Sequence, residues 1–264
     1  ARLALAVAVR AAVVHTMPQP HPKPHLLNTN AHRPKSSRPS KCPIPKSPSP
    51  KTTAKYRRIR PKRTAMQISD SFTRYRKHYP AEANRLRLLA KQLQCGDSEL
   101  TQRTNFVGHV TASAFIVNPT TKQVLLLQHK ALGSSLQPGG HVEPADKTIL
   151  AAAEREVMEE TGLDRSQLQL RSLYADNPQV PFDIDTHVIP ENPKKGEPGH
   201  YHHDFRYLFV TKERDVTIDP DESNGFAWVD WDEFRAHARF EAVAGKIEAL
   251  IGGNYKDSDL TGVK

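Results

Sequence analysis

The sequence predicts an α/β fold of the α+β kind with a mixed sheet, in a single domain that follows a disordered N-terminal tail. Three observations lead to this prediction. Several segments have the hydrophobic pattern of strands, and segments with helical periodicity are interleaved with them. A glycine-rich turn leads directly into a helix with three clustered glutamates, at residues 136–163. We expect the rest of the folded part, about 190 residues, to be scaffold and substrate pocket around this stretch.

Residues 1–65 differ in composition from the rest of the 264-residue chain. They hold fifteen of the 38 Lys and Arg residues, eleven of the 21 prolines and none of the 29 Asp and Glu residues. They therefore carry a charge of +15, and residues 66–264, with 23 basic side chains, carry −6. The overall charge of +9 belongs to the tail, so it does not indicate a nucleic-acid-binding domain.

We expect residues 1–65 to be disordered, because they have too few large apolar side chains to offset the entropy of ordering. The apolar residues 1–15 are too few for a membrane span, and we expect no membrane partner. The tail could be an organelle transit peptide, a basic arm for RNA or an anionic surface, or an upstream extension of a protein that starts at Met66. We expect a cytoplasmic protein, or one of an organelle matrix if the tail is a transit peptide.

Two cysteines, Cys42 and Cys95, are too few for a disulfide framework. We expect both thiols to be reduced. Neither has a neighbouring His, Asp or Asn that would indicate a nucleophile.

A helical segment, residues 66–104, is expected before the main domain. Residues 80–94 have the apolar spacing of an amphipathic helix, with Pro80 at its first position and Gly96 after its end. The aromatic residues ahead of it are expected in a helical turn that packs on the same side, and these are Phe72, Tyr75 and Tyr79.

The main domain, residues 105–254, is expected to begin with a β-hairpin. Residues 109–117 alternate as in a strand with one small, buried face, and residues 123–128 form an apolar strand after a turn at 118–121. The later elements are a strand within 168–176, a loop at 192–199, strands at 202–210 and 226–229, a helix to residue 251 capped by Asp230 with Glu233, and a flexible C-terminus at 255–264.

Three glutamates lie at positions i, i+3 and i+4 of the helix expected after Asp146, its predicted N-cap. On a helical wheel these residues flank the apolar stripe, whereas a solvated charged face normally lies opposite; they are Glu156, Glu159 and Glu160. Carboxylates this close repel one another unless a cation intervenes, and hard oxygen ligands select Mg²⁺ or Mn²⁺. Such a site suits phosphoryl transfer to water, although glutamate clusters on helices are more often solvated surface.

This stretch resembles the signature of the Nudix hydrolases, Gly-x5-Glu-x7-Arg-Glu-U-x-Glu-Glu-x-Gly-U, with U a large aliphatic residue. The second half matches without error, at Arg155, Glu156, Val157, Glu159, Glu160, Gly162 and Leu163. With the flanking hairpin, the resemblance covers roughly residues 105–252.

The resemblance implies an α/β/α sandwich that hydrolyses a nucleoside diphosphate linked to another group, X. It implies that Glu156, Glu159 and Glu160 bind Mg²⁺ or Mn²⁺, with the Gly139 carbonyl as a further candidate ligand. Arg155 would position a carboxylate, which places Arg155 and the three glutamates in the catalytic site.

The first half of the signature departs from the family pattern. Counting from Gly140, the glutamate position holds Asp146, and eight residues rather than seven separate Asp146 from Arg155. We interpret this as a one-residue insertion at the junction of loop and helix, which leaves the metal ligands intact. The carboxylate that orients Arg155 remains open between Asp146 and Glu143.

Several polar residues are candidate substrate contacts, namely Arg206, Asp204, His109, His141 and Gln128. Arg206 could hold a phosphate with its planar guanidinium. The neighbouring histidines could also face the cleft or lie on a partly exposed surface, and these are His200, His202 and His203. A separate Zn²⁺ site would need better-separated ligands, with flanking cysteines or a recognised motif. Candidates for an extra carboxylate outside the signature are Asp183 and Asp185.

Other functions compete with hydrolysis of a small nucleotide diphosphate, the expected substrate. A non-catalytic nucleotide-binding or regulatory domain of this family usually lacks signature glutamates, and here all three are present. Hydrolysis of capped RNA would use the basic tail. An isoprenyl diphosphate isomerase on the same scaffold needs an active cysteine–glutamate pair, which Cys95, ahead of the first core strand, does not offer. The identity of X and the oligomeric state are not predicted.

Overall fold

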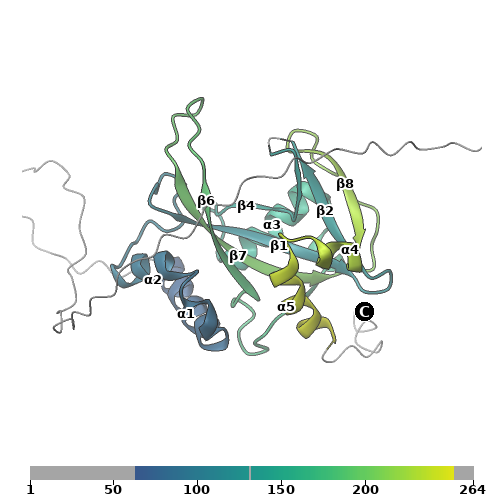
Figure 1. The fold of residues 1–264 in the computed structure, drawn as a ribbon, viewed down its shortest axis with the longest axis horizontal. Helices are drawn as coiled ribbons and strands as arrows, with labels where there is room; N and C mark the ends of the chain where they lie inside the picture. Colours follow the sequence, from purple (N-terminus) through teal and green to yellow (C-terminus); the bar gives the residue numbers. More distant parts are fainter. Residues whose placement is uncertain (1–62, 131, 253–264) are drawn as a thin grey trace, which may run out of the picture. The chain divides into compact units, whose positions relative to one another are not determined.

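The computed structural model describes residues 63–130 and 132–252, all within one compact unit (Figure 1). The predicted tail lies outside the described residues, except that residues 63–65 begin the helix α1 (Arg63–His78). The predicted flexible C-terminus, residues 255–264, also lies outside them.

The described residues form a mixed, eight-stranded sheet with helices packed against it, which confirms the predicted fold class. The central path is β3-β2-β1-β7-β5, and β4 pairs with β1, β6 with β7 and β8 with β2. The strands β1 and β7 run parallel, side by side through the middle of the sheet (Figure 1). The strand bounds are β1 (His109–Asn118), β2 (Gln123–His129), β3 (Ser134–Leu136), β4 (Gly139–His141), β5 (Gln169–Arg171), β6 (Asp183–Ile189), β7 (His200–Val210) and β8 (Ser223–Asp230).

The predicted hairpin is confirmed, because β1 and β2 pair antiparallel. The Asn118 side-chain oxygen accepts hydrogen bonds from the backbone N–H groups of Thr120 and Thr121, which closes the turn. The prediction of one buried face was too narrow, since all ten residues of β1 are buried.

Alternate residues of β1 belong to two hydrophobic clusters, so the clusters cover opposite faces of the sheet. One cluster joins Ala112 and Ala114 to the helix α3 (Ile149–Thr161) and to α1 and α2 (Arg87–Gln94). The other joins Phe115 to α4 (Trp231–Ala236) and α5 (Glu241–Gly252). The central strands are therefore sandwiched between helices.

The N-terminal helical segment differs from the prediction in its boundaries. The expected single turn around Tyr75 is a full helix, α1, and the expected helix over 80–94 is divided. Pro80 begins a short 3₁₀ helix, η1 (Pro80–Ala83), and α2 starts only at Arg87. Leu86 and Leu89 are buried as predicted.

Other elements differ from the prediction in their boundaries or were not predicted. The strand predicted within 168–176 is limited to the three residues of β5, whereas the run 183–189 forms the strand β6. The single C-terminal helix is divided into α4 and α5. Asp230 makes no capping hydrogen bond, so the predicted capping box is wrong; its carboxylate accepts from the Gln123 side chain at 3.0 Å.

Cys95, at the C-terminal end of α2, is disulfide-bonded, which contradicts the expectation of a reduced thiol there.

Among the described residues, no helix is both long and apolar enough to cross a bilayer.

Candidate active site

The helix α3 carries the signature glutamates, and its ends are fixed by two specific residues. Its N-cap is Thr148, whose hydroxyl accepts the backbone N–H of Ala151 at 3.0 Å, so the prediction of Asp146 as N-cap was wrong. Gly162 ends the helix with a left-handed φ of 68° and donates its N–H to Met158 O at 2.9 Å. The predicted apolar side of the helix is buried, at Ile149, Leu150, Ala153 and Val157.

Arg155 lies at the centre of the signature residues. Its Nη1 atom is 2.8 Å from Glu159 Oε2 and 3.0 Å from Glu156 Oε1, and Nη2 donates to the carbonyl of His141 at 2.9 Å. Glu156 is buried, whereas the Glu159 side chain is 51% exposed. Arg155 thus joins the glutamate helix to the strand β4.

The carboxylate that orients Arg155 is Asp146. Arg155 Nε donates to Asp146 Oδ1 at 3.2 Å, and Arg155 Nη2 lies 3.1 Å from Asp146 Oδ2. The same Oδ2 accepts the backbone N–H of Glu143 at 2.8 Å, and the Glu143 residue is exposed. Thr148 is therefore the N-cap of α3, and Asp146, at the glutamate position of the signature, is the partner of Arg155.

The glycines of β4 allow the strand to approach the glutamates. A Cβ on Gly140 would lie 2.6 Å from Glu156 Oε1, so a larger residue would displace this carboxylate. Gly139 has a φ of 156°, and a Cβ there would lie 2.3 Å from Ser113 Cβ on β1. The Gly139 backbone N–H donates to the Glu160 carboxylate.

Burial and mutual repulsion disfavour the charged forms of the inner carboxylates. Burial raises the pKa of Glu156 to about 7, against the lowering effect of Arg155. Burial, a hydrogen bond to Glu222 and the charge of Glu156 raise the pKa of Glu160 to about 9. A divalent cation would relieve this repulsion, so the donor set fits Mg²⁺ or Mn²⁺.

Glu222, ahead of β8, is a carboxylate that the sequence analysis missed. Its side chain shares a hydrogen bond with Glu160, and its backbone carbonyl accepts the N–H of Lys130. The residue lies 62 positions after Glu160 in a polar turn, and no local pattern distinguishes it. Only the pairing of β8 with β2 places it at the site.

The predicted extra carboxylates, Asp183 and Asp185, belong instead to an ionic network around Arg206. The guanidinium of Arg206 contacts three carboxylates, Asp183 at 3.1 Å, Asp185 at 3.0 Å and Asp204 at 3.0 Å. All three of its nitrogens are therefore engaged by the protein. Its predicted contact with a phosphate stays a prediction from the sequence.

Asp204 also accepts hydrogen bonds from β1. Its Oδ2 accepts from Ser113 Oγ at 2.7 Å, and its Oδ1 accepts from Thr111 Oγ1 at 3.2 Å. Since Ser113 pairs with Gly139, this buried carboxylate supports the strand behind the signature loop.

The other predicted contacts differ in exposure. Gln128 is exposed on β2, beside Gly225. His141 is half-buried and follows the signature glycines directly, whereas His109 is only 1% exposed and lies among other histidines. Gln128 and His141 are thus the predicted contacts that a ligand could reach most directly.

A family model of the NUDIX domain matches residues 107–250, which is more than half of the chain. The chain belongs to the Nudix family. With Arg155 and all three signature glutamates present on one helix, it is a Nudix pyrophosphohydrolase. The resemblance inferred from the signature is thereby confirmed at the level of the family.

The fold is similar to that of several solved structures. An Ap4A hydrolase of C. elegans, in a binary complex, is 19% identical, with 56% of this chain and 99% of that chain covered and a TM-score of 0.42. A dihydroneopterin triphosphate pyrophosphohydrolase of E. coli is 21% identical, with coverages of 55% and 96% and a TM-score of 0.43. A Nudix hydrolase of Clostridium perfringens is 25% identical, with coverages of 55% and 98% and a TM-score of 0.41. A search among curated proteins gave no significant match.

Proposed function

We propose that this Nudix pyrophosphohydrolase depends on Mg²⁺ or Mn²⁺ and cleaves the diphosphate linkage of a nucleoside diphosphate joined to another group. The supporting observation is that Glu156 and Glu160 lie buried side by side on α3, close to the glycines of β4 and to Glu222. Buried carboxylates without a cation are unfavourable, and the cations that prefer such oxygen ligands also bind phosphates.

The metal ligands in this proposal are Glu156, Glu159 and Glu160, with the Gly139 carbonyl and Glu222 as further candidates. When bound, the cation neutralises charge on the diphosphate and activates the attacking water. Arg155 holds Glu156 and Glu159 near each other, and Asp146 holds Arg155. A glutamate of α3 or Glu222 accepts the proton that the water loses.

We further propose that the substrate contacts Gln128 and His141. Both residues are accessible, and His141 shares β4 with the signature glycines. His109 is buried, whereas Asp204 and Arg206 are engaged by other side chains of the protein. In this proposal Asp204 and Arg206 act by holding β1 and β7 in place.

The first test is hydrolysis of a substrate panel with Mg²⁺ or Mn²⁺, using nucleotide sugars, dinucleotides, deoxynucleoside triphosphates and capped RNA. Products from reactions in ¹⁸O-water identify the phosphorus attacked. We expect Glu159→Gln and Glu160→Gln each to lower turnover by roughly 100-fold or more, because each removes a charged metal ligand.

The matched control is Glu154→Gln, the same substitution on the same helix but outside the signature. Glu154 pairs with Arg165 at 3.4 Å and does not contact the glutamate cluster, so its activity should stay near that of the wild type. Near-wild-type turnover in both Glu159→Gln and Glu160→Gln would refute the assignment of the site. A wild-type chain that binds nucleotides but hydrolyses none of the panel would favour the regulatory function, and salt-sensitive cleavage of capped RNA would favour the RNA function.

A further inference from the structure

Five histidines from four strands gather at one end of the sheet. They are His109 on β1, His141 on β4, His187 on β6, and His200 and His202 on β7. The parallel register pairs His109 with His202, and the antiparallel register pairs His187 with His202. The ring centroids of neighbouring histidines lie 4.6 to 5.8 Å apart.

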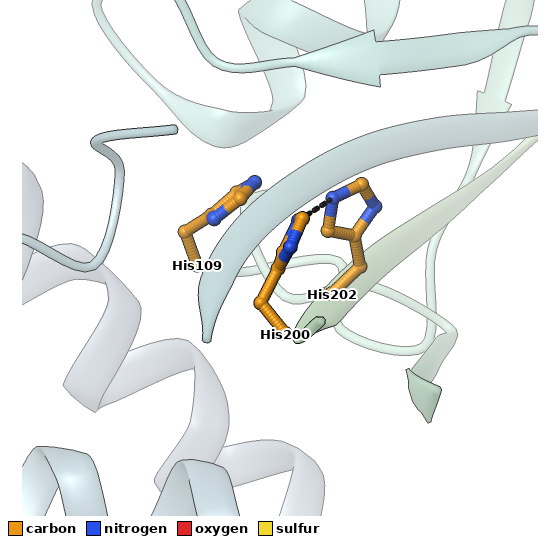
Figure 2. A group of neighbouring side chains, drawn as sticks. All are labelled: His109, His200 and His202. Atoms are coloured by element: carbon orange, nitrogen blue, oxygen red, sulfur yellow. Dashed lines mark hydrogen bonds between the residues drawn. The ribbon is translucent and has the colours of Figure 1, made fainter. Parts of the chain in front are cut away.

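Three of these side chains converge on one point. One ligand atom from each of His109, His200 and His202 lies within 4.8 Å of the other two. Figure 2 shows the three rings side by side, and its dashed line marks the contact between His200 and His202. The Nε2 atoms of these two rings are 3.3 Å apart. Two ligands at about 2.05 Å from a tetrahedral Zn²⁺ are roughly 3.3 Å apart, so this pair is already spaced as zinc ligands are.

The backbone fixes which ring nitrogens are available. His109 Nδ1 lies 3.2 Å from the carbonyl of Asn105, and His200 Nδ1 lies 2.8 Å from the carbonyl of Pro198. A carbonyl only accepts, so each Nδ1 carries the proton and each Nε2 presents its lone pair. Metal-bound histidines are held in this way, by a hydrogen bond from the nitrogen that does not bind the metal.

One of these lone pairs has no use within the protein. The Nε2 atom of His109 is buried and has no hydrogen-bond partner among the described residues, although the residue is only 1% exposed. A buried polar atom without a partner costs free energy, typically about 1–3 kcal/mol. A ligand at the point where the three rings converge would satisfy it.

We propose that His109, His200 and His202 bind a divalent transition metal of the Zn²⁺ class, at a site separate from the glutamate cluster. The fourth position is taken by water or by His141, whose ring lies 5.2 Å from the rings of both His109 and His202. This site lies beside the active site, because the carbonyl of His141 accepts the hydrogen bond from Arg155.

The chemistry of the ligands selects this metal class. Imidazoles prefer Zn²⁺ and its neighbours in the first transition row, whereas Mg²⁺ prefers oxygen ligands. The sequence alone did not predict the site, because His109 is 91 residues from His200 in the chain. Only the pairing of β1 with β7 brings these two histidines together.

The proposal is tested by titrating Zn²⁺ into the metal-free, full-length protein in excess Mg²⁺, with a chromogenic chelator as competitor. We expect one Zn²⁺ per chain for the wild type. His109→Ala and His200→Ala should each weaken Zn²⁺ binding by about 100-fold or more, beyond the 10–100-fold typical of changes to outer-shell partners. Zn²⁺ should raise the midpoint of thermal unfolding of the wild type but not of these variants.

Two controls distinguish this site from other zinc-binding groups. His237→Ala, at an exposed histidine of the segment between α4 and α5, should bind Zn²⁺ as the wild type does. Glu160→Gln should also retain Zn²⁺, so the result does not depend on the proposed hydrolysis. If His109→Ala does not fold, His202→Gln at the less buried ligand provides the same test. A wild type that binds no Zn²⁺, or folded variants that bind it with unchanged affinity, would overturn the proposal.

Discussion

Asp146 keeps its contact with Arg155 although the signature has one extra residue between the two positions. The insertion before α3 changes the spacing between this carboxylate and Arg155, yet the two side chains still meet through two hydrogen bonds. This is possible because Thr148, and not Asp146, caps the helix, which leaves the Asp146 carboxylate available. The spacing alone could not choose between Asp146 and Glu143, because the choice depends on the path of the loop.

We expect Asp146→Asn to lower turnover about tenfold without changing the midpoint of thermal unfolding by more than a few degrees. The amide loses the charge that holds Arg155, and loss of an outer-shell partner commonly costs 10–100-fold in activity. Steady-state kinetics at saturating Mg²⁺ test this, and the effect should fall on kcat rather than KM. Glu143→Gln is the matched control, because the Glu143 side chain is exposed and only its backbone contacts Asp146. Equal losses in both variants would contradict the assigned role of Asp146.

At the scale of single residues, the sequence located what lies within one helix and missed what comes from elsewhere in the fold. Glu156, Glu159 and Glu160 could be placed together because helical geometry relates them directly, and Arg155 was placed with them by the resemblance of the signature. Glu222 could not, since its approach to Glu160 depends on strand pairing. Two of the carboxylates that pair with Arg206 are Asp183 and Asp185 on β6, so this network could not be predicted before the pairing of β6 with β7 was known.

At the scale of elements, strands with clear alternation were predicted within one or two residues, and helix boundaries were predicted less well. β1 was recognised from its alternation and β2 from its short apolar run after a turn, and both signals are local. The C-terminal helix was predicted as continuous because Phe234, Phe240 and Ile247 fit one apolar stripe, but they pack into one cluster from two helices and the segment between them. A shared hydrophobic face does not reveal where one helix ends and the next begins.

We expect substitution by alanine to have opposite effects on stability at two glycines, Gly162 at the C-terminal end of α3 and Gly245 within α5. Gly162 ends α3 with a left-handed φ of 68°, and an added Cβ would also lie 3.1 Å from Thr217 Cβ. Gly162→Ala should therefore lower the free energy of unfolding by about 1–2 kcal/mol. Gly245 is exposed within α5 and has nothing within 4 Å of the position of a Cβ. Gly245→Ala should raise the free energy of unfolding by about 0.5–1 kcal/mol.

Urea denaturation of the two variants beside the wild type measures both changes. A loss of stability in Gly245→Ala, or none in Gly162→Ala, would show that backbone conformation does not govern these positions. The Gly162 variant should also lose activity, because the last turn of α3 carries Glu159 and Glu160.

At the scale of the whole domain, an ionic network holds the N-terminal and C-terminal helices to the edge of the sheet. Asp183 on β6 is its centre, in contact with Arg206 on β7 at 3.1 Å, Lys246 on α5 at 2.5 Å and Arg85, just ahead of α2, at 3.2 Å. The hydroxyl of Tyr75 on α1 also donates to this carboxylate, at 3.2 Å. Together with the hydrophobic cluster that α1 and α2 share with β1, the network joins the helical segment before residue 105 to the rest of the domain.

The same network predicts how stability depends on pH. Burial alone would raise the pKa of Asp183, but the charges of Arg206, Lys246 and Arg85 outweigh burial and hold this pKa below its usual value. A carboxylate with a lowered pKa in the folded state stabilises the protein above about pH 4, its unfolded pKa, and this contribution is lost as the pH falls further. Asp183→Asn should therefore lower the free energy of unfolding by about 3–5 kcal/mol at pH 7.

Urea denaturation of the wild type and of Asp183→Asn at pH 7, 5 and about 3 checks this dependence, with the middle and lowest values chosen on either side of the unfolded pKa. The difference between the two proteins should be the same at pH 7 and 5 and smaller at the lowest pH, because protonation removes the charge that the variant lacks. Asp176→Asn is the control, since its exposed pair with Arg74 should contribute less than about 1 kcal/mol at any pH. A difference that stays constant down to the lowest pH would mean that Asp183 stabilises the domain by shape and hydrogen bonding, and that its charge is not what joins the helices to the sheet.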